Sequence, residues 1–466
     1  MKRLVGLTLA TGLSLTVVSG AAAPAPTYED LAVDLLRQYL RIDTTNPPGN
    51  ELKAALFLKG VLEKEGIPVE IDEFEPGRAN LLATLKGDGS RRPLLVANHM
   101  DVVPADASRW SVSPFSAEIK NGAIYGRGAV DMKSEGIVQL VAFIRLKREN
   151  VPLARDVFFL ATSDEEVDFA GAERALSPEG FGGRLRAAEY AIMEGGENRL
   201  DPQGKPLYFG VRTAMKAPFW LKLSTTGRPG HGSRPLADSA PNRLVAALDK
   251  IRLHSTAMRV VPTVERFLRD QAALVAEPRR SWYQDIRKAI ADPSTARAIE
   301  RDDEAVAAQL RDTISITVVR AGYRTNVIPG TAEAELDVRL LPGSERQAFL
   351  QEIRGVIADP GVEVTPLQET FHPASESDTD TPLFHAIERA VGRHHPGVPV
   401  TTLLGTGATE SAVTRPLGIV SYGFTSLLLT EEEDSSQHAD DERLNEAAFR
   451  AAPSLLYEVL ADACRR

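Results

Sequence analysis

The stretch LLVANHMD at residues 94–101 joins a short apolar run to a histidine and an aspartate. Three other short apolar runs, at residues 157–161, 191–193 and 419–422, are also bounded by polar turns. Runs of this kind are typical of strands that helices cover on both faces. Apolar residues at helical spacing over 137–144 lie between the first two runs, which gives a β-α-β order. The sequence therefore predicts an α/β fold with a mixed, mostly parallel sheet flanked by helices.

The middle of the chain has a different pattern. Apolar residues alternate with other residues over 219–223 and again over 332–340, where charged residues stand between them. This alternation indicates one solvated face, as in an antiparallel sheet with helices on one side. Residues from about 240 to 312 have a mostly helical pattern. We therefore predict a second, α+β domain, inserted into the first at residues 214–372.

The first residues resemble a targeting segment. Lys2 and Arg3 precede an uncharged apolar stretch that runs to Val18, and small residues follow at 19–23. This order is typical of a secretory signal peptide. The apolar stretch has about 15 residues, fewer than the roughly 20 that a helix needs to cross a bilayer. We expect residues 1–23 to direct export, and hence a periplasmic or secreted product with no membrane span after signal removal.

The composition excludes several classes of protein. With 466 residues, of which 43% are hydrophobic and 25% charged, the chain is typical of a globular protein and unlike a disordered chain, a fibre or a multi-pass membrane protein. Its formal net charge is -10, whereas a nucleic-acid-binding protein needs a basic face. The single cysteine, Cys464, excludes an internal disulfide and a cysteine-rich metal site. Any metal must therefore bind to histidine and carboxylate side chains.

Polar side chains follow three of the apolar runs. His99 and Asp101 come after the first run, the sequence Asp-Glu-Glu at 164–166 follows the second, and Glu194 ends the third. In an open α/β sheet, ligands bind outside the carboxyl ends of the strands. Asp131 comes after two nearby glycines, at the predicted start of a helix. Because clustered carboxylates repel one another unless a cation lies among them, this pattern predicts a metal site.

Several short motifs resemble those of the M20 metallopeptidase family, in the family's order and at similar separations. They are NHMDVVP at 98–104, YGRGAVDMK at 125–133, DEE at 164–166, MEGG at 193–196, NVIP at 326–329 and DVR at 337–339. Together they extend over nearly all of the chain that follows the expected signal peptide. The resemblance therefore concerns the whole predicted architecture.

This resemblance adds a branch of the family and a domain organisation. Residues between Trp110 and Phe115 resemble the aminoacylase and carboxypeptidase S branch, whose members act on N-acyl amino acids or small peptides. The resemblance implies a catalytic domain in two parts, at residues 24–213 and 373–466. The insertion at 214–372 would then be a lid or dimerisation domain, which is consistent with a homodimer.

The resemblance also implies a centre of two zinc ions per subunit, in which cobalt or manganese could replace zinc. The implied ligands are His99 and Glu194 for one metal, Glu166 and His438 for the other, and Asp131 as the bridge between them. Asp101 would orient His99. Glu165 would act as the general acid and base.

Three residues of the insertion are implied in catalysis or substrate binding. His231 resembles the family histidine that reaches an active site, often that of the partner subunit, and stabilises the oxyanion. Asn326 and Arg339 resemble groups that hold the substrate's free carboxylate. One segment departs from the family, which usually reads Gly-Thr-Asp-Ala-Arg. Here Glu410 stands at the Asp position and Ala412 at the Arg position, so the substrate pocket differs while the implied metal ligands do not.

Two classes of function follow. The first is an exported di-zinc metallohydrolase that cleaves the amide bond of short peptides or N-acyl amino acids with a free carboxylate, as a carboxypeptidase or dipeptidase does. Its alternative is an N-acyl amino-acid deacylase. The second class is a non-catalytic binding protein on the same fold, against which the complete ligand set and Glu165 argue. The expected partners are the small substrate and, in a homodimer, a second copy of the chain, but no nucleic acid.

Overall fold

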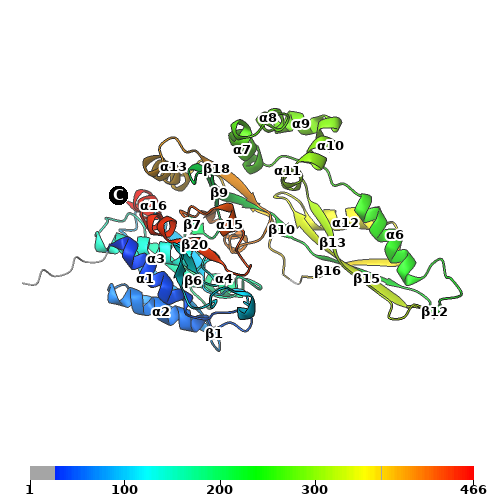
Figure 1. Ribbon diagram of the computed structural model, residues 1–466, viewed down its shortest axis with the longest axis horizontal. Helices are drawn as coiled ribbons and strands as arrows, with labels where there is room; N and C mark the ends of the chain where they lie inside the picture. The colour runs from blue at the N-terminus through cyan, green and yellow to red at the C-terminus, as the bar shows by residue number, and fades with distance from the viewer. Residues whose placement is uncertain (1–26, 369) are drawn as a thin grey trace, which may run out of the picture.

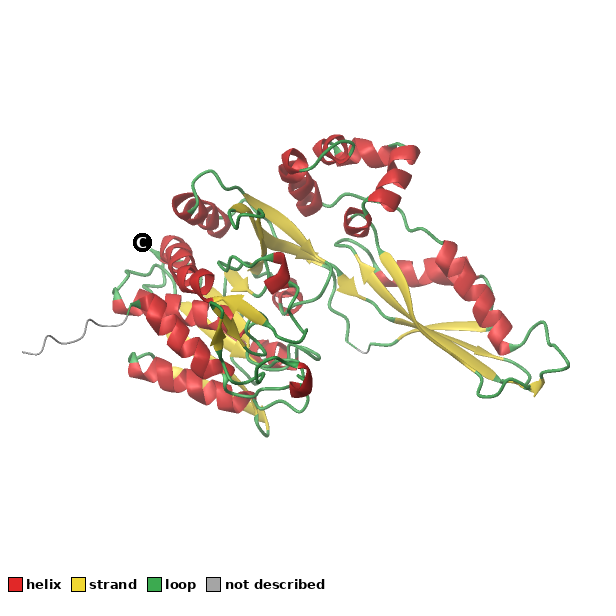
Figure 2. Ribbon diagram, in the orientation of Figure 1, coloured by secondary structure: helices red, strands yellow, loops and turns green. Residues whose placement is uncertain are grey.

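The computed structural model describes residues 27–368 and 370–466, so the predicted signal peptide lies outside the described residues. Two sheets, each with its own helices, lie at opposite ends of an elongated molecule (Figure 1). The larger sheet contains the runs that end in the candidate site residues. The smaller sheet lies at the far end, and a group of short helices lies along one side of the molecule (Figure 2).

The larger sheet has ten strands in the order β1-β2-β6-β3-β7-β19-β9-β17, with β8 and β18 also paired to β9. The neighbouring strands β6, β3, β7 and β19 are parallel, whereas β1, β2, β8 and β17 pair antiparallel. The strands are β1 (Val69–Glu75), β2 (Arg78–Leu85), β3 (Leu94–His99), β6 (Val157–Thr162), β7 (Tyr190–Met193), β8 (Glu197–Leu200), β9 (Pro206–Met215), β17 (Ser375–Glu376), β18 (Val400–Gly405) and β19 (Val420–Gly423). The predicted mixed sheet is confirmed.

Both faces of this sheet are buried, which explains the continuous apolar runs. Every residue of β3 and β6 is buried. Successive side chains of a strand point to opposite faces, so Val96 and Phe159 join one hydrophobic cluster while Leu95 and Phe158 join another. The first cluster includes α1 (Tyr28–Leu40), α2 (Glu51–Lys64), α3 (Lys133–Arg148), α13 (Pro382–His394) and α16 (Glu446–Cys464). The second cluster includes α4 (Ala170–Leu176), α5 (Gly182–Leu185) and the edge of α14 (Ser411–Thr414).

The smaller sheet is antiparallel throughout, as the alternating pattern predicts. Along β15 the burial alternates almost strictly, because one face packs on helices and the other meets solvent. The strands are β10 (Ala217–Pro218), β11 (Leu221–Thr226), β13 (Thr313–Ala321), β15 (Thr331–Leu340) and β16 (Val362–Pro366), and the helices are α6 (Ala240–Leu253) and α12 (Arg346–Ile357). Beyond them lies a two-stranded ribbon of β12 (Gly230–His231) and β14 (Val327–Ile328), at the tip farthest from the larger sheet (Figure 1).

The helical segment expected near 240–312 divides between the two sheets. Only α6 packs on the smaller sheet. The remaining helices form a separate cluster that includes Ala214 of β9, Leu404 of β18 and Leu341 after β15, and α7 joins this cluster to the larger sheet by packing on β18. They are α7 (Pro262–Gln271), α8 (Arg279–Gln284), α9 (Ile286–Ala291), α10 (Pro293–Asp302) and α11 (Glu304–Gln309). The chain thus leaves the larger sheet after Met215, returns to its edge, and re-enters it at Ser375.

A small three-stranded sheet brings the end of the chain to the candidate site. It pairs β20 (Arg443–Asn445) with β5 (Ala123–Tyr125), which also pairs with β4 (Ile119–Lys120). The short helix α15 (Glu431–Asp434) precedes β20, and short 3-10 turns occur at Ala107–Arg109, Ala272–Leu274 and Arg415–Leu417. Among the described residues, no helix combines the length and apolar character needed to cross a bilayer.

Candidate metal centre

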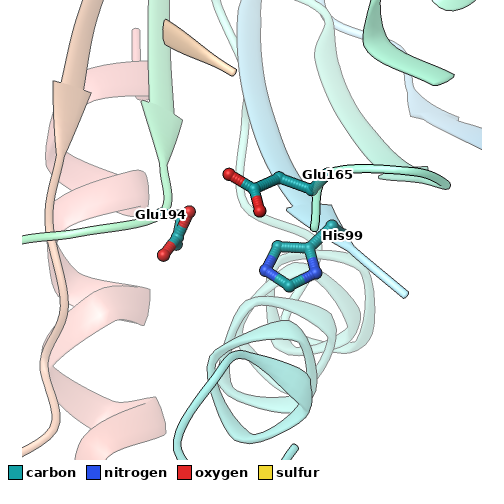
Figure 3. A group of neighbouring side chains, drawn as sticks. All are labelled: His99, Glu165 and Glu194. Atoms are coloured by element: carbon teal, nitrogen blue, oxygen red, sulfur yellow. The ribbon is translucent and has the colours of Figure 1, made fainter. Parts of the chain in front are cut away.

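The carboxyl ends of three neighbouring strands meet at one point. β3 pairs in parallel with both β6 and β7, so the residues that follow these strands lie at the same edge of the sheet. His99 ends β3, Glu165 lies three residues after β6, and Glu194 follows β7 directly. One ligand atom from each of these three side chains lies within 4.8 Å of the others. Figure 3 shows the two carboxylates and the imidazole ring facing a common space.

A second group shares His99 with the first. One ligand atom each from His99, Asp131 and Glu166 also lies within 4.8 Å of the others. The two oxygens of Asp131 face two different histidines, at 3.1 Å from His99 Nε2 and 3.2 Å from His438 Nε2. His438 Nε2 is 3.1 Å from Glu166 Oε2. The structure therefore brings together all five side chains that the family resemblance implies as ligands, with Asp131 in the middle.

The loop that carries Asp131 is held by a buried carboxylate far along the chain. Glu442 accepts hydrogen bonds from the backbone amides of Gly128, Val130 and Asp131, at 3.0, 2.7 and 3.0 Å. It also pairs with Arg127 at 2.6 Å, and both side chains are almost fully buried. Because Glu442 lies four residues after His438, one carboxylate fixes the segments of two candidate ligands. Nothing in the local sequence distinguishes Glu442, and sequence reasoning missed it.

The Asp101 side chain holds the turn that carries Glu165 and Glu166 in a similar way. Its carboxylate accepts hydrogen bonds from the backbone amides of Glu165 and Glu166, both at 3.1 Å, and from the Asn46 side chain at 2.9 Å. Nδ1 of His99 lies 3.0 Å from the backbone oxygen of Asp101 and 3.5 Å from its carboxylate. Asp101 thus contacts the His99 ring through its backbone and the Glu165–Glu166 turn through its side chain. Asn46, which also donates to the Asp164 carboxylate at 2.9 Å, completes this network.

Asp164 has a structural task in this turn. Its backbone is left-handed, with φ of 70°, and its carboxylate accepts hydrogen bonds from Arg78 and Asn46. Its backbone oxygen accepts hydrogen bonds from the amides of Asp168 and Phe169. The consecutive carboxylates at 164–166 therefore divide between the support of the turn and the cluster itself.

The clustered charges shift the acid–base properties of the site. Burial, together with the negative charge of Glu194, raises the pKa of Glu165 well above its usual range. Burial and the nearby Asp131 raise the pKa of Glu194 to about 7. Hydrogen bonds to Asp131 and Glu166 raise the pKa of His438 to about 10. These shifts show that the site is a cluster of negative charges, which a bound cation would stabilise.

The donor set fits divalent metal ions. Glu166 Oε1 and Glu194 Oε2 are buried and have no hydrogen-bond partner among the described residues. A buried carboxylate oxygen without a partner is costly unless a metal ion or water satisfies it. Two imidazoles and three carboxylates supply the nitrogen and oxygen atoms that zinc accepts, and cobalt or manganese accepts them too.

The three residues predicted in the insertion lie elsewhere. His231 is exposed on the β12–β14 ribbon, where its Nδ1 lies 2.7 Å from the Ser233 hydroxyl, and Asn326 lies next to it, with its backbone oxygen bound to the Gly232 amide. The ten residues of β15 span about 30 Å between this ribbon and Arg339. Arg339 forms an ion pair with Asp337 at 2.7 Å. No hydrogen bond or ion pair among residues 27–368 and 370–466 joins any of the three to the cluster, and their assigned tasks stay predictions.

The segment that departs from the family pattern lies close to the cluster. The Glu410 carboxyl is buried, its Oε1 has no hydrogen-bond partner in the described part of the chain, and burial raises its pKa to about 7. Its charge interacts with His99 and Asp101. Ala412 is buried within α14 and offers no polar group. The departure therefore keeps a carboxyl group beside the candidate centre, one methylene longer than the family's aspartate, and replaces the family's arginine with an apolar side chain.

A cavity of about 820 Å³ opens beside the cluster. Asp131 and Glu194 contribute to its wall, and Gln271, Leu274 and Val275 bring the group of short helices to its other side. The helices that pack on the sheet edge thus shape the space next to the candidate centre. A volume of this size is in the range of small-molecule binding sites.

Comparison with known proteins identifies the family. The sequence profile described as Peptidase family M20/M25/M40 matches residues 95–462, most of the chain. The chain belongs to this family. It is a metallopeptidase or amidohydrolase of the M20 type, and the M20 prediction is confirmed.

Three M20-related proteins give the scale of the similarity. Human aminoacylase-1 is 28% identical over 430 residues, which cover 91% of this chain and 93% of the relative. Human N-fatty-acyl-amino acid synthase/hydrolase is 28% identical over 398 residues, covering 82% of this chain and 76% of the relative. The structure of an M20 family metallo-carboxypeptidase from Sulfolobus solfataricus superimposes with a TM-score of 0.70 at 22% identity, over 93% of this chain and 99% of that chain. The last comparison confirms the M20 fold.

Proposed function

We propose that this M20 metallohydrolase removes the acyl group from N-acyl amino acids that have a free carboxylate, and that it uses two zinc ions per subunit. The observation that carries the chemistry is the position of the Glu165 carboxylate, within 4.8 Å of His99 and Glu194 and beside the second ligand group. The similarity to human aminoacylase-1 over nearly the full length of both chains supports the substrate class, in preference to a peptide.

The side chains divide into two sets of ligands and one acid–base group. His99 and Glu194 would hold one zinc ion, Glu166 and His438 the other, and Asp131 would bridge them. Bound there, the two ions supply an acidified water and a polarised amide carbonyl. Glu165 is not needed as a ligand, so its carboxylate can take a proton from that water and deliver it to the amine that leaves. Its raised pKa is shifted in the direction that suits a group which must hold and return a proton.

The alternative substrate is a short peptide. The fold match to an M20 metallo-carboxypeptidase favours it, and the chemistry at Glu165 is the same because both substrates are cleaved at an amide bond. The two readings differ only in what lies on the acyl side of that bond. Substrate comparison therefore separates them without any change to the assignment of the centre.

The test uses the chain from Pro24 onward, loaded with zinc. Elemental analysis should give two zinc ions per chain, and chelation should stop the release of amino acids from a panel of N-acetyl amino acids. Matched dipeptides are the comparison: faster release from the dipeptides would replace the deacylase with a peptidase. Two bound zinc ions with no release from any substrate would support a binding protein, and failure to bind zinc would refute the assignment of the ligands.

We further propose that the protein is exported through residues 1–23. The support is the pattern of a basic start, a short apolar stretch and small residues. The full chain should be expressed in a bacterial host, the periplasm and medium separated from the cytoplasm, and the mature N-terminus sequenced. A mature chain that begins at residue 22–24 outside the cytoplasm supports export, and a full-length cytoplasmic protein refutes it.

A homodimer would allow His231 to act. Within one chain His231 lies on the distal ribbon, away from the cluster, so its predicted contact with the oxyanion requires a second copy. Glu165→Gln and His231→Ala chains, each inactive alone, should regain activity when they are mixed and refolded together, because one of the two mixed sites then has both groups. A mixture that stays inactive would refute the sharing of sites.

A further inference from the structure

The side chain of Arg212 runs through a channel formed by three glycines. A Cβ atom at Gly405 would lie 2.8 Å from Arg212 Cδ, one at Gly423 would lie 3.0 Å from Arg212 Cβ, and one at Gly195 would lie 2.8 Å from Nη1. Separations this short are far below an ordinary van der Waals contact, so no other residue type fits at these positions while Arg212 keeps its place. Three separate strand ends thus leave room for one extended arginine.

The channel leads the guanidinium to the metal centre. Nη1, Cζ and Nε of Arg212 all lie against Gly195, the residue that directly follows the candidate ligand Glu194. Arg212 and Glu194 both contribute to the wall of the 820 Å³ cavity. The guanidinium is therefore placed where a substrate bound at the centre would extend into the cavity.

Unlike Arg199 in the cavity wall and the buried Arg415, Arg212 keeps its side-chain donors free of acceptors among the described residues. Arg199 pairs with Glu431 at 3.3 Å, and Arg415 donates to the backbone oxygens of Arg212 and Ser421. In the described part of the chain, no hydrogen bond or ion pair links the Arg212 guanidinium to a protein oxygen. The positive charge of Arg212 lowers the pKa of carboxyl groups in the cavity wall, Glu194 among them, but no described carboxylate lies within ion-pairing distance of it.

A fixed cation beside a metal centre needs an anionic partner. Like charges repel, so an arginine next to two divalent ions weakens their binding unless an anion lies between them. The acyl amino acids of the proposed function bring such an anion, because their carboxylate lies a few atoms from the amide bond that is cleaved. The fork of a guanidinium binds a carboxylate through two parallel hydrogen bonds.

We propose that Arg212 binds a carboxylate of the substrate and thereby selects acids over the corresponding amides. This inference rests on the proposed function for the identity of the substrate. Arg212 is a specificity-determining residue in it, and the reaction itself stays with Glu165 and the metal ligands. The carboxylate is that of the released amino acid in the simplest case, and a carboxylate on the acyl group has the same chemistry.

The test compares substrates that differ only in charge. N-acetyl-L-methionine has its carboxylate on the amino acid, N-acetyl-L-methioninamide has none, and N-succinyl-L-methioninamide has one on the acyl group. For the zinc-loaded Arg212→Ala enzyme, we expect KM for the preferred acid to rise about 10- to 100-fold, which is the loss of charged hydrogen bonds. We expect kcat to change less than about threefold and hydrolysis of the uncharged amide to stay as in the wild type. Whichever charged substrate shows the loss identifies the source of the carboxylate.

Two further variants make the result specific. Arg212→Lys keeps the charge without the fork, so it should recover part of the affinity for the acid. Arg199→Ala removes the same charge from the same cavity wall, but from a side chain that is paired and largely exposed, and should leave the preference for acids unchanged. Zinc content should be two per chain in every variant. Equal losses for the acid and the amide, or a fall in kcat with KM unchanged, would overturn the proposal.

A binding measurement separates this inference from the proposed function. Calorimetry with the product L-methionine and with L-methioninamide measures recognition of the carboxylate without turnover. If the wild-type enzyme hydrolyses no acyl amino acid, the proposed function fails, but a preference for methionine over its amide that Arg212→Ala abolishes still supports Arg212. A wild-type enzyme that binds neither compound, or both equally well, refutes it.

Discussion

The carboxylate of Asp101 accepts a hydrogen bond from the backbone amide of Glu165 at 3.1 Å. The same carboxylate holds the amide of Glu166, while the backbone oxygen of Asp101 lies 3.0 Å from Nδ1 of His99. A single buried residue thus couples a candidate ligand on one strand end to the acid–base group and another ligand on the next. Both the affinity for metal and the rate of hydrolysis should depend on this link.

Replacement of Asp101 by asparagine should impair both properties. An asparagine side chain has only one acceptor oxygen, so it cannot receive the amides of both Glu165 and Glu166. We expect zinc affinity and kcat each to fall about 10- to 100-fold, as for other partners that orient ligands. A chelator competition assay and initial rates measure the two effects. Asp106→Asn, an exposed residue on the same loop, is the matched control, and a result for D101N equal to this control would contradict the link.

Replacement of Glu165 by glutamine should stop turnover and leave the metal in place. The amide cannot exchange a proton with water or with the leaving amine, and general acid–base catalysis contributes about 10²- to 10⁴-fold. Elemental analysis should still give two zinc ions per chain, because the ligands are intact. Glu179→Gln, an exposed residue on the turn after α4, controls for the loss of a charge. Near-normal turnover in E165Q would show that another group moves the proton.

Binding of zinc should release protons. In the metal-free chain, the pKa of His438 is raised to about 10, so this imidazole is protonated at pH 7.5 and must lose its proton to become a ligand. We expect roughly one proton to be released from this residue, and zinc affinity to increase with pH until about pH 10. Calorimetric titration with zinc in two buffers of different ionisation enthalpy measures the number of protons.

The His438→Ala variant gives the control for this measurement. It should bind one zinc ion fewer and release fewer protons. The stability of the metal-free chain should depend on pH in the opposite direction to the zinc affinity. Because the pKa of His438 is raised, its ion pairs stabilise the fold fully below about pH 6.5, and this contribution is lost as the pH rises through 10. Zinc binding whose heat is the same in both buffers would show that His438 is already neutral.

Lys216 should make the stability of the protein depend on alkaline pH. Lys216 lies between β9 of the larger sheet and β10 of the smaller sheet. Its buried amine donates to the backbone oxygens of Ala308 and Arg311 and to the Thr313 hydroxyl. Burial lowers its pKa from 10.5 to about 8. The unfolded chain therefore binds more protons between these values, and the wild type should gain stability as the pH rises from 8 to 10.5.

The Lys216→Met variant isolates this effect, since it lacks the titrating group. The difference in unfolding free energy between wild type and K216M should shift by about 3 kcal/mol in favour of the wild type across that pH range. Urea unfolding at pH 7.5, 9 and 10.5 measures it. Lys205→Met, at an exposed turn before β9, should show a constant difference. A constant difference for K216M as well would mean that the Lys216 amine has the same pKa in the folded and unfolded chains.

Much of the fold could be predicted because its signals are local. The apolar runs that end in His99 and Glu194 are strands buried on both faces, and the alternation over 332–340 is a strand with one solvated face. The sequence also predicts that residues between 240 and 312 are mostly helical, but it does not predict which sheet each helix packs against. Whether α7 to α11 pack on the smaller sheet or on β9 and β18 depends on which apolar surfaces meet, and a helical pattern does not encode this.

The amino-acid sequence alone determined which residues can bind metal and which predicted strand each of them follows. Strand periodicity and the residue after each strand are properties of a few consecutive positions, so they can be read directly. Only the tertiary structure decided the contacts between distant segments: Glu442 on the Asp131 loop, Asn46 on Asp101, and Arg212 within its three glycines. These contacts join residues that are tens to hundreds of positions apart, and their formation depends on the packing of whole elements, which no local pattern specifies.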